Sequence, residues 1–261
     1  MKITVMCVVR DSADILPVCL KRLEAVGKGH DMEYYFYEND SKDNTVELLE
    51  TWLLDKNGKV FSEILDAPSF GHTVEKDRME RMAYYRNTLL DKIKPLDSEY
   101  CLVIDADIDF TPDIIDKYMM HMSTIVAMCT PYVKQSVKCN MCNCGKHSYY
   151  DTYALMDTDG NLGITLSCNP LPVTSAFGGV ALIKTDVMNK VKWSTNGGCE
   201  HWNFCKEVNK YGDVIVIPTV ESFVKIDKWE LAPIQKEHQQ KLIDDPWYRW
   251  SQKALSSNSN N

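Results

Sequence analysis

Apolar and polar positions alternate in blocks along the N-terminal half of the chain. Four segments have the length of strands and cover residues 2–9, 32–37, 62–65 and 100–104; the first and the last are apolar runs. Three segments between them carry apolar residues at helical spacing and predict helices over residues 12–26, 45–54 and 75–93. Gly27 and Pro95 follow two of these segments, where helix-ending residues are expected. Strands that alternate with helices in this way predict an α/β fold with a mostly parallel central sheet flanked by helices.

The apolar pattern is less regular after residue 111. The elements expected there are strands over residues 124–132, 174–184 and 214–218, a helix over 199–211 and a Cys-rich loop over 138–150. Residues 256–261 are Ser and Asn only, a composition typical of a disordered tail. No internal repeat and no low-complexity linker divides the remaining sequence, so we expect a single domain over residues 1–255.

Composition narrows the classes of partner. The chain has 261 residues, 44% of them hydrophobic and 25% charged, as in an ordinary globular protein. Its 29 Lys and Arg against 37 Asp and Glu give a formal net charge of -8. An acidic balance argues against a nucleic-acid partner, which usually needs a basic face. A small anionic ligand held by a few local Arg and Lys side chains stays compatible with this charge.

Two sequence features indicate the cellular compartment of the protein: its ten cysteines and its N-terminal apolar run. The run over residues 2–9 is short, lacks a cleavage site and ends in Arg10-Asp11, so we interpret it as a strand and not as a signal peptide. No stretch reaches the ~20 apolar residues that span a bilayer. We therefore expect reduced thiols, a cytoplasmic, soluble protein and no integral membrane segment. Association with a membrane surface is left open.

Two carboxylates at a predicted strand end are the strongest chemical feature. The apolar run over residues 100–104 leads directly into Asp105 and Asp107. Positions two apart share a face, and carboxylates so placed can hold Mg²⁺ or Mn²⁺ together with substrate phosphates. Such a cation neutralises a diphosphate leaving group. The alternative is a polar turn whose Asp side chain caps a helix starting near Thr111-Pro112.

Two further polar clusters belong to predicted helices. Residues 37–45, Tyr-Glu-Asn-Asp-Ser-Lys-Asp-Asn-Thr, follow the second strand, and their oxygens can accept hydrogen bonds from a base or ribose; they also suit a simple helix cap. Arg78, Arg81 and Arg86 lie on the predicted helix over 75–93. Arginine suits bidentate contact with phosphate. The alternative is a solvated helix face with acidic neighbours, which we favour for Arg78 and less for Arg86.

The order and spacing of these motifs resemble a GT-A type glycosyltransferase over residues 2–224. The motifs that carry the resemblance are Val9-Arg10-Asp11, Glu38-Asn39-Asp40-Ser41, Tyr85-Arg86-Asn87, Asp105-Ala106-Asp107, Phe177-Gly178-Gly179 and Gly198-Cys199-Glu200-His201. Residues 150–157 are similar to a segment of the fungal capsule-associated α-1,3-mannosyltransferases. The resemblance implies a nucleotide-sugar half over about residues 1–110 and an acceptor half over about 111–255. It implies transfer of a sugar from a UDP- or GDP-sugar to a hydroxyl of a glycan or glycoprotein, assisted by Mn²⁺ or Mg²⁺.

Residue roles follow from the same resemblance. It assigns donor binding to Arg10, Glu38, Asp40, Arg86, Asp105, Gly179 and Lys225. It assigns metal binding to Asp105 and Asp107, and Asp107 is expected to be the direct ligand of the cation. Glu200 matches the carboxylate that acts as general base in inverting members, although the capping of a helix N-terminus is an alternative for it.

Two positions depart from the pattern of this family. His201 stands where a second acidic residue is usual, and it is an alternative metal ligand, an acceptor contact or a buried structural histidine. Lys225 stands where many members have a metal-binding histidine, and a lysine there can touch the diphosphate directly. The Glu200 match implies an inverting enzyme, whereas the mannosyltransferase segment implies a retaining one that uses GDP-mannose.

A separate cluster lies in the Cys-rich loop. Cys139, Cys142, Cys144 and His147 are ligand types that can complete a tetrahedral Zn²⁺ site. Four ligands within one short loop leave little room, so we favour a simple cluster of reduced thiols. The rival functions are a non-catalytic nucleotide-binding module with a Zn-stabilised loop and a nucleotidyltransferase. No Gly-rich phosphate loop near the N-terminus supports the second rival.

Overall fold

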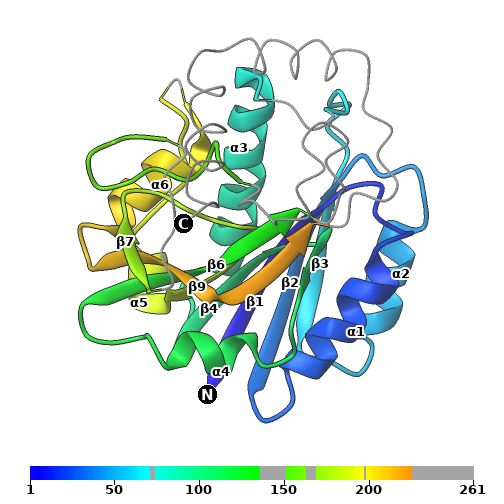
Figure 1. Ribbon diagram of the computed structural model, residues 1–261. Coiled ribbons are helices and arrows are strands. Elements are labelled where there is room, and N and C mark those ends of the chain that lie inside the picture. The colour runs from blue at the N-terminus through cyan, green and yellow to red at the C-terminus, as the bar shows by residue number, and fades with distance from the viewer. Residues whose placement is uncertain (71–73, 136–150, 163–168, 197, 225–261) are drawn as a thin grey trace, which may run out of the picture.

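The computed structural model describes residues 1–70, 74–135, 151–162, 169–196 and 198–224 (Figure 1). Three predicted features lie outside the described residues: the Cys139, Cys142, Cys144 and His147 cluster, the donor role of Lys225 and the tail over 256–261. In the part of the chain that is described, no helix is long and apolar enough to cross a bilayer.

The described strands form one sheet, in the spatial order β3-β2-β1-β4-β8-β6-β9-β5, with β7 beside β9. The strands are β1 (Lys2–Val9), β2 (Asp31–Asn39), β3 (Gly58–Glu63), β4 (Tyr100–Asp105), β5 (Ile108–Phe110), β6 (Val126–Gln135), β7 (Leu171–Val173), β8 (Val180–Lys184) and β9 (Asp213–Val224). The helices are α1 (Leu16–Val26), α2 (Thr45–Leu53), α3 (Lys76–Ile93), α4 (Ile114–Met119), α5 (Thr185–Met188) and α6 (Glu200–Val208).

The first four strands, β3, β2, β1 and β4, are parallel, and each crossover between them contains one helix. β1 lies at the centre of this group and is apolar almost throughout, because its residues are buried on both faces of the sheet. Helix α1 packs against α2, and α3 packs against α6 (Figure 1). This half of the molecule therefore has the strand and helix alternation that the sequence predicts.

The remaining strands make the sheet mixed. β8 runs antiparallel to β4 and to β6, while β9 is parallel to β6 and antiparallel to β5 and β7. The predicted class, a single α/β domain with a central sheet flanked by helices, is confirmed. The half of the sheet that contains β1 is parallel throughout, whereas the other half has both parallel and antiparallel pairs.

The structure differs from the local expectations at several points, among them the start of the helix expected over 12–26, which begins at Leu16. The predicted strand over 62–65 lies instead at Gly58–Glu63, directly after a turn. The predicted strand over 174–184 is interrupted, because Gly178 and Gly179 have φ values of 65° and 74° that end an extended run, and β8 begins only at Val180. Strands β5 and β7 were not expected, since three residues are too few for a periodic pattern.

Candidate functional site

The carboxyl ends of β1, β2 and β4 meet at one edge of the sheet. Val9 of β1 is in register with Glu38 of β2, and Val8 is in register with Asp105 of β4. The backbone N–H of Asp105 donates to the Gly179 carbonyl at 2.8 Å, which brings the turn before β8 to the same edge. The polar residues expected after the first, second and fourth strands of the chain therefore lie close together. In open α/β sheets, this edge is where ligands bind.

A buried arginine connects two carboxylates at this edge. Nη1 of Arg86 donates to Oε1 of Glu200 at 2.7 Å, and Nη2 donates to Oδ1 of Asp105 at 3.2 Å. Arg86 is 3% exposed, and its guanidinium lies over the ring of Phe177, 5.3 Å from the ring centroid. Because Arg86 comes from α3, Asp105 from β4 and Glu200 from α6, these contacts link three elements. Breaking such a buried network leaves an unpaired charge, so it holds the site in one arrangement.

Asp105 and Asp107 lie in an environment that disfavours their charge. Burial raises the pKa of Asp105 to about 6, with Arg86 opposing the shift and Asp107 adding to it. Burial also raises the pKa of Asp107. A bound cation would favour the ionised form of both carboxylates. Carboxylate oxygens are ligands that Mg²⁺ and Mn²⁺ prefer, and two of them suffice when the phosphates of a substrate supply the remaining ligands. Among the described residues, no three His, Cys, Asp or Glu side chains form a group that could hold a metal ion.

Helix α6 begins with Glu200, whose carboxylate is ionised at neutral pH, and His201, whose imidazole is neutral. Burial favours the protonated form of Glu200, yet His201, Arg86 and its own backbone N–H lower its pKa to about 2. Burial lowers the pKa of His201 to about 3, against the attraction of Glu200. Nε2 of His201 lies 3.5 Å from Oε1 of Glu200, and the imidazole stacks on Phe177 with 4.2 Å between ring centroids. Nδ1 of His201 is buried and has no hydrogen-bond partner among the described residues. The predicted metal role of His201 stays a prediction.

Glu38 is 2% exposed, and its carboxylate is bound to the protein on both oxygens. Oε1 accepts from the backbone N–H of Ser41 at 2.6 Å, and Oε2 accepts from the hydroxyl of Ser62 at 2.5 Å. These bonds tie the loop after β2 to β3. A role of Glu38 in binding the donor stays a prediction, and the structure gives the residue a role in shaping the loop.

Asp40 organises the neighbouring loop in the same way. Its carboxylate accepts from the backbone N–H groups of residues 65–67, at 2.7, 2.9 and 3.1 Å. Although burial works the other way, the amide of Asn39 and these backbone donors lower the pKa of Asp40 to about 2. Nη1 of Arg10 lies 3.8 Å from Oδ2 of Asp40 and donates to the Pro68 carbonyl at 3.2 Å. Arg10 and Asp40, both predicted donor-binding residues, are thus brought together.

Asp151 is a residue of this site for which the sequence motifs predict no role. Its Oδ2 accepts from the backbone N–H of Gly178 at 3.2 Å. Burial raises the pKa of Asp151 to about 6, the Gly178 N–H opposes that shift, and the charges of Asp105 and Glu200 add to it. The sequence signal that points to it is the segment over 150–157, whose similarity to mannosyltransferases gives this carboxylate no role.

An aromatic pair lies beside these carboxylates. The rings of Tyr153 and Trp202 are 5.0 Å apart between centroids, and the indole N–H of Trp202 donates to the Tyr153 carbonyl at 2.7 Å. Both side chains are partly exposed. Gly198 makes room for the indole, because a Cβ at that position would lie 2.4 Å from the Trp202 ring. The pair offers an apolar surface with a polar rim, as ligand pockets commonly do.

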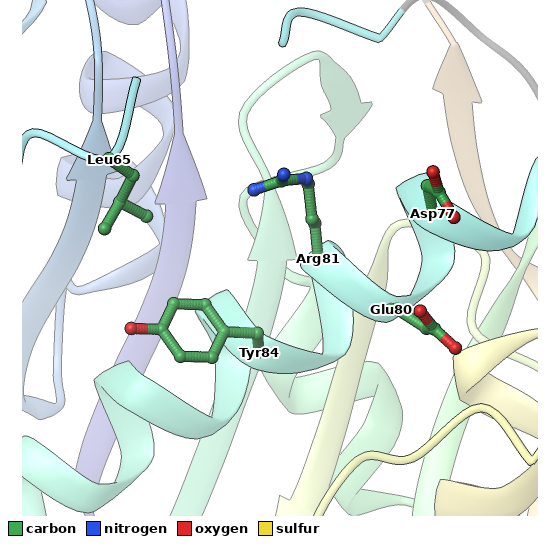
Figure 2. A pocket seen from close by; sticks show the side chains of 5 residues that line it. All are labelled: Leu65, Asp77, Glu80, Arg81 and Tyr84. Atoms are coloured by element: carbon green, nitrogen blue, oxygen red, sulfur yellow. The ribbon is translucent and has the colours of Figure 1, made fainter. Parts of the chain in front are cut away.

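A cavity of about 420 Å³ lies between α3 and the segment after β3. Its lining consists of Leu65, Asp77, Glu80, Arg81 and Tyr84. Figure 2 shows Arg81 and Tyr84 extending from α3 toward Leu65. Since the backbone N–H of Leu65 is held by Asp40, this cavity adjoins the loop that the predicted donor-binding residues organise.

Comparison with known proteins gives structural matches only. No family model matches the chain, and no curated protein matches its sequence. The mannosyltransferase PcManGT from Pyrobaculum calidifontis, solved with GDP-Man and Mn²⁺, superposes with a TM-score of 0.58 at 15% identity, over 87% of this chain and 58% of that one. S. aureus TarS 1–349 in complex with UDP-GlcNAc superposes with a TM-score of 0.55 at 14% identity, over 89% of this chain and 62% of that one.

These matches establish the fold. The chain has the mixed α/β architecture of GT-A proteins, as the sequence motifs predict. It spans about three fifths of the length of the two solved chains. The finer resemblance to fungal capsule-associated mannosyltransferases stays a prediction.

Proposed function

We propose that this protein is a glycosyltransferase that moves a sugar from a UDP- or GDP-sugar to a hydroxyl of a glycan or glycoprotein. The observation that carries the proposal is the buried Arg86 bridge between Asp105 and Glu200, at the ligand-binding edge of a GT-A sheet and next to Asp107. Two proteins with the same fold support it, one solved with GDP-Man and Mn²⁺ and one with UDP-GlcNAc.

On the donor side, Asp105 and Asp107 are the residues that would hold Mn²⁺ or Mg²⁺. The cation, when bound, neutralises negative charge on the diphosphate. Arg86 keeps Asp105 oriented and adds positive charge next to it. The nucleoside is received by the loops that Glu38 and Asp40 organise, and the other proposed donor contacts are Arg10, Gly179 and Lys225.

The reaction exchanges one bond at the anomeric carbon of the sugar. The acceptor oxygen bonds to that carbon, the bond from the carbon to the diphosphate oxygen breaks, and its electron pair leaves with the diphosphate. The proton of the acceptor hydroxyl passes to a base of the protein. Glu200 is the residue that the sequence predicts for this role, and His201 is proposed as a metal ligand or acceptor contact.

Nucleotide binding measured by calorimetry tests this proposal. UDP and GDP are titrated into the folded protein with Mn²⁺ and with a chelator in its place. We expect one nucleotide to bind with Mn²⁺, and Asp107→Asn to weaken that binding by about tenfold or more without lowering the melting temperature. A folded protein that binds neither nucleotide with Mn²⁺ contradicts the proposal.

The same preparation separates the rival functions. Binding of a nucleoside diphosphate without turnover of any nucleotide sugar indicates a binding module. Release of pyrophosphate from a nucleoside triphosphate indicates a nucleotidyltransferase. A glycosyltransferase instead releases the nucleoside diphosphate from its donor, and this product identifies the reaction class.

A further inference from the structure

Four carboxylates act on one another at this edge of the sheet, and three of them already have a partner or a proposed role. Glu200 accepts from Arg86 at 2.7 Å and has His201 beside the same oxygen. Asp105 accepts from the other guanidinium nitrogen, and together with Asp107 it forms the oxygen pair suited to a cation. Among the described residues, Asp151 has neither a bond to a basic side chain nor a place in the cation-binding pair, and its Oδ2 accepts from the backbone N–H of Gly178.

Glu200 is poorly suited to take a proton. It is 4% exposed, so an acceptor hydroxyl has little access to its oxygens. Protonation would also remove the charge that Arg86 needs inside the protein, where an unpaired cation is costly. Asp151 is partly exposed, and no basic side chain of the described residues is paired with its carboxylate. Efficient bases titrate near the working pH, and the pKa of Asp151 is raised to about 6 whereas that of Glu200 is lowered to about 2.

The surroundings of Asp151 place it on the acceptor side. Tyr153 follows it by two residues, and the Tyr153 ring lies 5.0 Å from the ring of Trp202 on α6. A sugar acceptor can lay an apolar face on this partly exposed pair and direct a hydroxyl toward the neighbouring carboxylate. The groups that act electrostatically on Asp151 or feel its charge are Asp105 of β4, Glu200 of α6 and the thiols of Cys199 and Cys205.

We propose that Asp151 is the general base that takes the proton from the acceptor hydroxyl. This inference rests on the proposed function. The hydroxyl proton passes to an Asp151 oxygen while the acceptor oxygen bonds to the anomeric carbon, and the diphosphate leaves from the opposite face with the electron pair. The reaction therefore inverts the anomeric configuration. Glu200 is then a positioning residue, which acts through Arg86.

Asp151→Asn tests the assignment with little change in shape. The carboxylate accepts from the backbone N–H groups of Gly178 and Ala154, and the Asn Oδ1 can keep the bond from Gly178 that holds the turn before β8. We expect kcat for transfer to fall by about 10²- to 10⁴-fold, while the Kd for the nucleoside diphosphate and the melting temperature stay unchanged. Asp159→Asn is the matched control, because Asp159 is an exposed carboxylate in the same segment, and its transfer rate should equal that of the wild type.

The pH dependence of kcat/KM distinguishes a base from a structural residue, because replacing a purely structural Asp151 would not change it. Wild-type kcat/KM should fall as the pH drops below about 6, and this acid limb should be lost from the residual activity of Asp151→Asn. Two wild-type measurements decide the matter if the variant does not fold: the pH profile and the anomeric configuration of the product by NMR. A flat profile down to about pH 5 overturns the assignment. A product with retained configuration also overturns it.

Failure of the base and failure of the proposed function are distinguishable. If the wild type transfers sugar and Asp151→Asn does so at the same rate, Asp151 is not the base and the proposed function stands. If Glu200→Gln, and not Asp151→Asn, abolishes the acid limb, the base is Glu200. A folded wild type that turns over no nucleotide sugar overturns the function, and the base assignment with it.

Discussion

Arg86 is the side chain on which the geometry of the site depends most. Its two hydrogen bonds join residues that are 114 and 19 positions away in the sequence. We predict that Arg86→Met lowers the free energy of unfolding by about 3–5 kcal/mol, because it leaves the buried Glu200 carboxylate unpaired. Arg86→Lys should lower the free energy of unfolding less, because lysine keeps the positive charge but cannot donate to both carboxylates as the planar guanidinium does. Urea denaturation measures both variants.

Arg81→Met on the same helix is the control for this prediction. Arg81 lines the cavity of Figure 2 and takes no part in the buried bridge, so its replacement should change the free energy of unfolding by no more than about 0.5 kcal/mol. An Arg86→Met protein as stable as Arg81→Met would show that the bridge does not hold α3, β4 and α6 together.

Asp40 makes a prediction about pH. Its carboxylate holds three backbone N–H groups, and its pKa of about 2 lies below the ordinary value of 3.8. A lowered carboxyl pKa adds stability that is complete above about pH 4 and is lost as the pH falls toward 2. Asp40→Asn should therefore lower the free energy of unfolding by about 1–3 kcal/mol at pH 7, and by progressively less below pH 4.

Denaturant titrations between pH 7 and pH 3 measure that difference. Asp66→Asn, in the loop that Asp40 holds, is the control, because Asp66 is exposed and an Asn tolerates its φ of 48°. A deficit of Asp40→Asn that stays constant over the whole pH range would mean that the charge of Asp40 contributes nothing.

The residues of the site differ in how far the sequence could predict them. Asp105 and Asp107 follow a buried strand, and a strand end is a local property of the sequence. The hydrogen bond from Arg86 to Glu200 could not be predicted from the sequence. A helical pattern shows which residues belong to one helix, but it does not show which distant carboxylate an arginine of that helix contacts. Asp151 was missed for the same reason, since its partial burial and its acidic neighbours arise only on folding.

At the scale of elements, the turn before β8 is the tightest point of the site. Gly179 has a φ of 74°, and a Cβ there would lie 2.1 Å from Cγ1 of Ile108 in β5. Gly179→Ala should therefore lower the free energy of unfolding by about 1 kcal/mol for the left-handed backbone and by about 1–3 kcal/mol more for the clash. Transfer activity should fall with it, because the Gly179 carbonyl holds the Asp105 N–H.

Gly29→Ala separates these two contributions. Gly29 has a φ of 91°, and nothing lies within 4 Å of a Cβ built on it, so this variant should show the backbone cost alone, about 1 kcal/mol. Thermal and urea unfolding measure both variants. Equal losses for Gly179→Ala and Gly29→Ala would contradict the close approach of the turn before β8 to Ile108 of β5.

The elements themselves were predicted best where their patterns are long. The expected strand over 2–9 coincides with β1, and the expected helices over 45–54 and 75–93 lie within one residue of α2 and α3 at each end. β5 and β7 were missed because each has three residues, which show no period, and because both are held by pairing with β9 near the end of the described chain. Short strands of this kind are set by tertiary contacts and not by local sequence.

At the scale of the whole molecule, charge sets the conditions for binding. The chain carries a net charge of -8, and acidic side chains outnumber basic ones around Arg86, so an anionic nucleotide needs a cation to offset them. We predict that Mn²⁺ and a nucleoside diphosphate together, at about 100 times Kd, raise the free energy of unfolding by about 2.7 kcal/mol. The nucleotide without the metal should raise it far less. Equal stabilisation with a chelator present would contradict this account.

The proposed function of this edge of the sheet is the transfer of a sugar from a nucleotide donor. Its most direct test is release of nucleoside diphosphate from a panel of UDP- and GDP-sugars with Mn²⁺ and candidate glycan acceptors, for the wild type and for Asp107→Asn. We predict turnover of at least one donor by the wild type and a rate about 100-fold lower for the folded Asp107→Asn protein. No turnover of any donor by the folded wild type, or an undiminished rate in Asp107→Asn, would contradict the account.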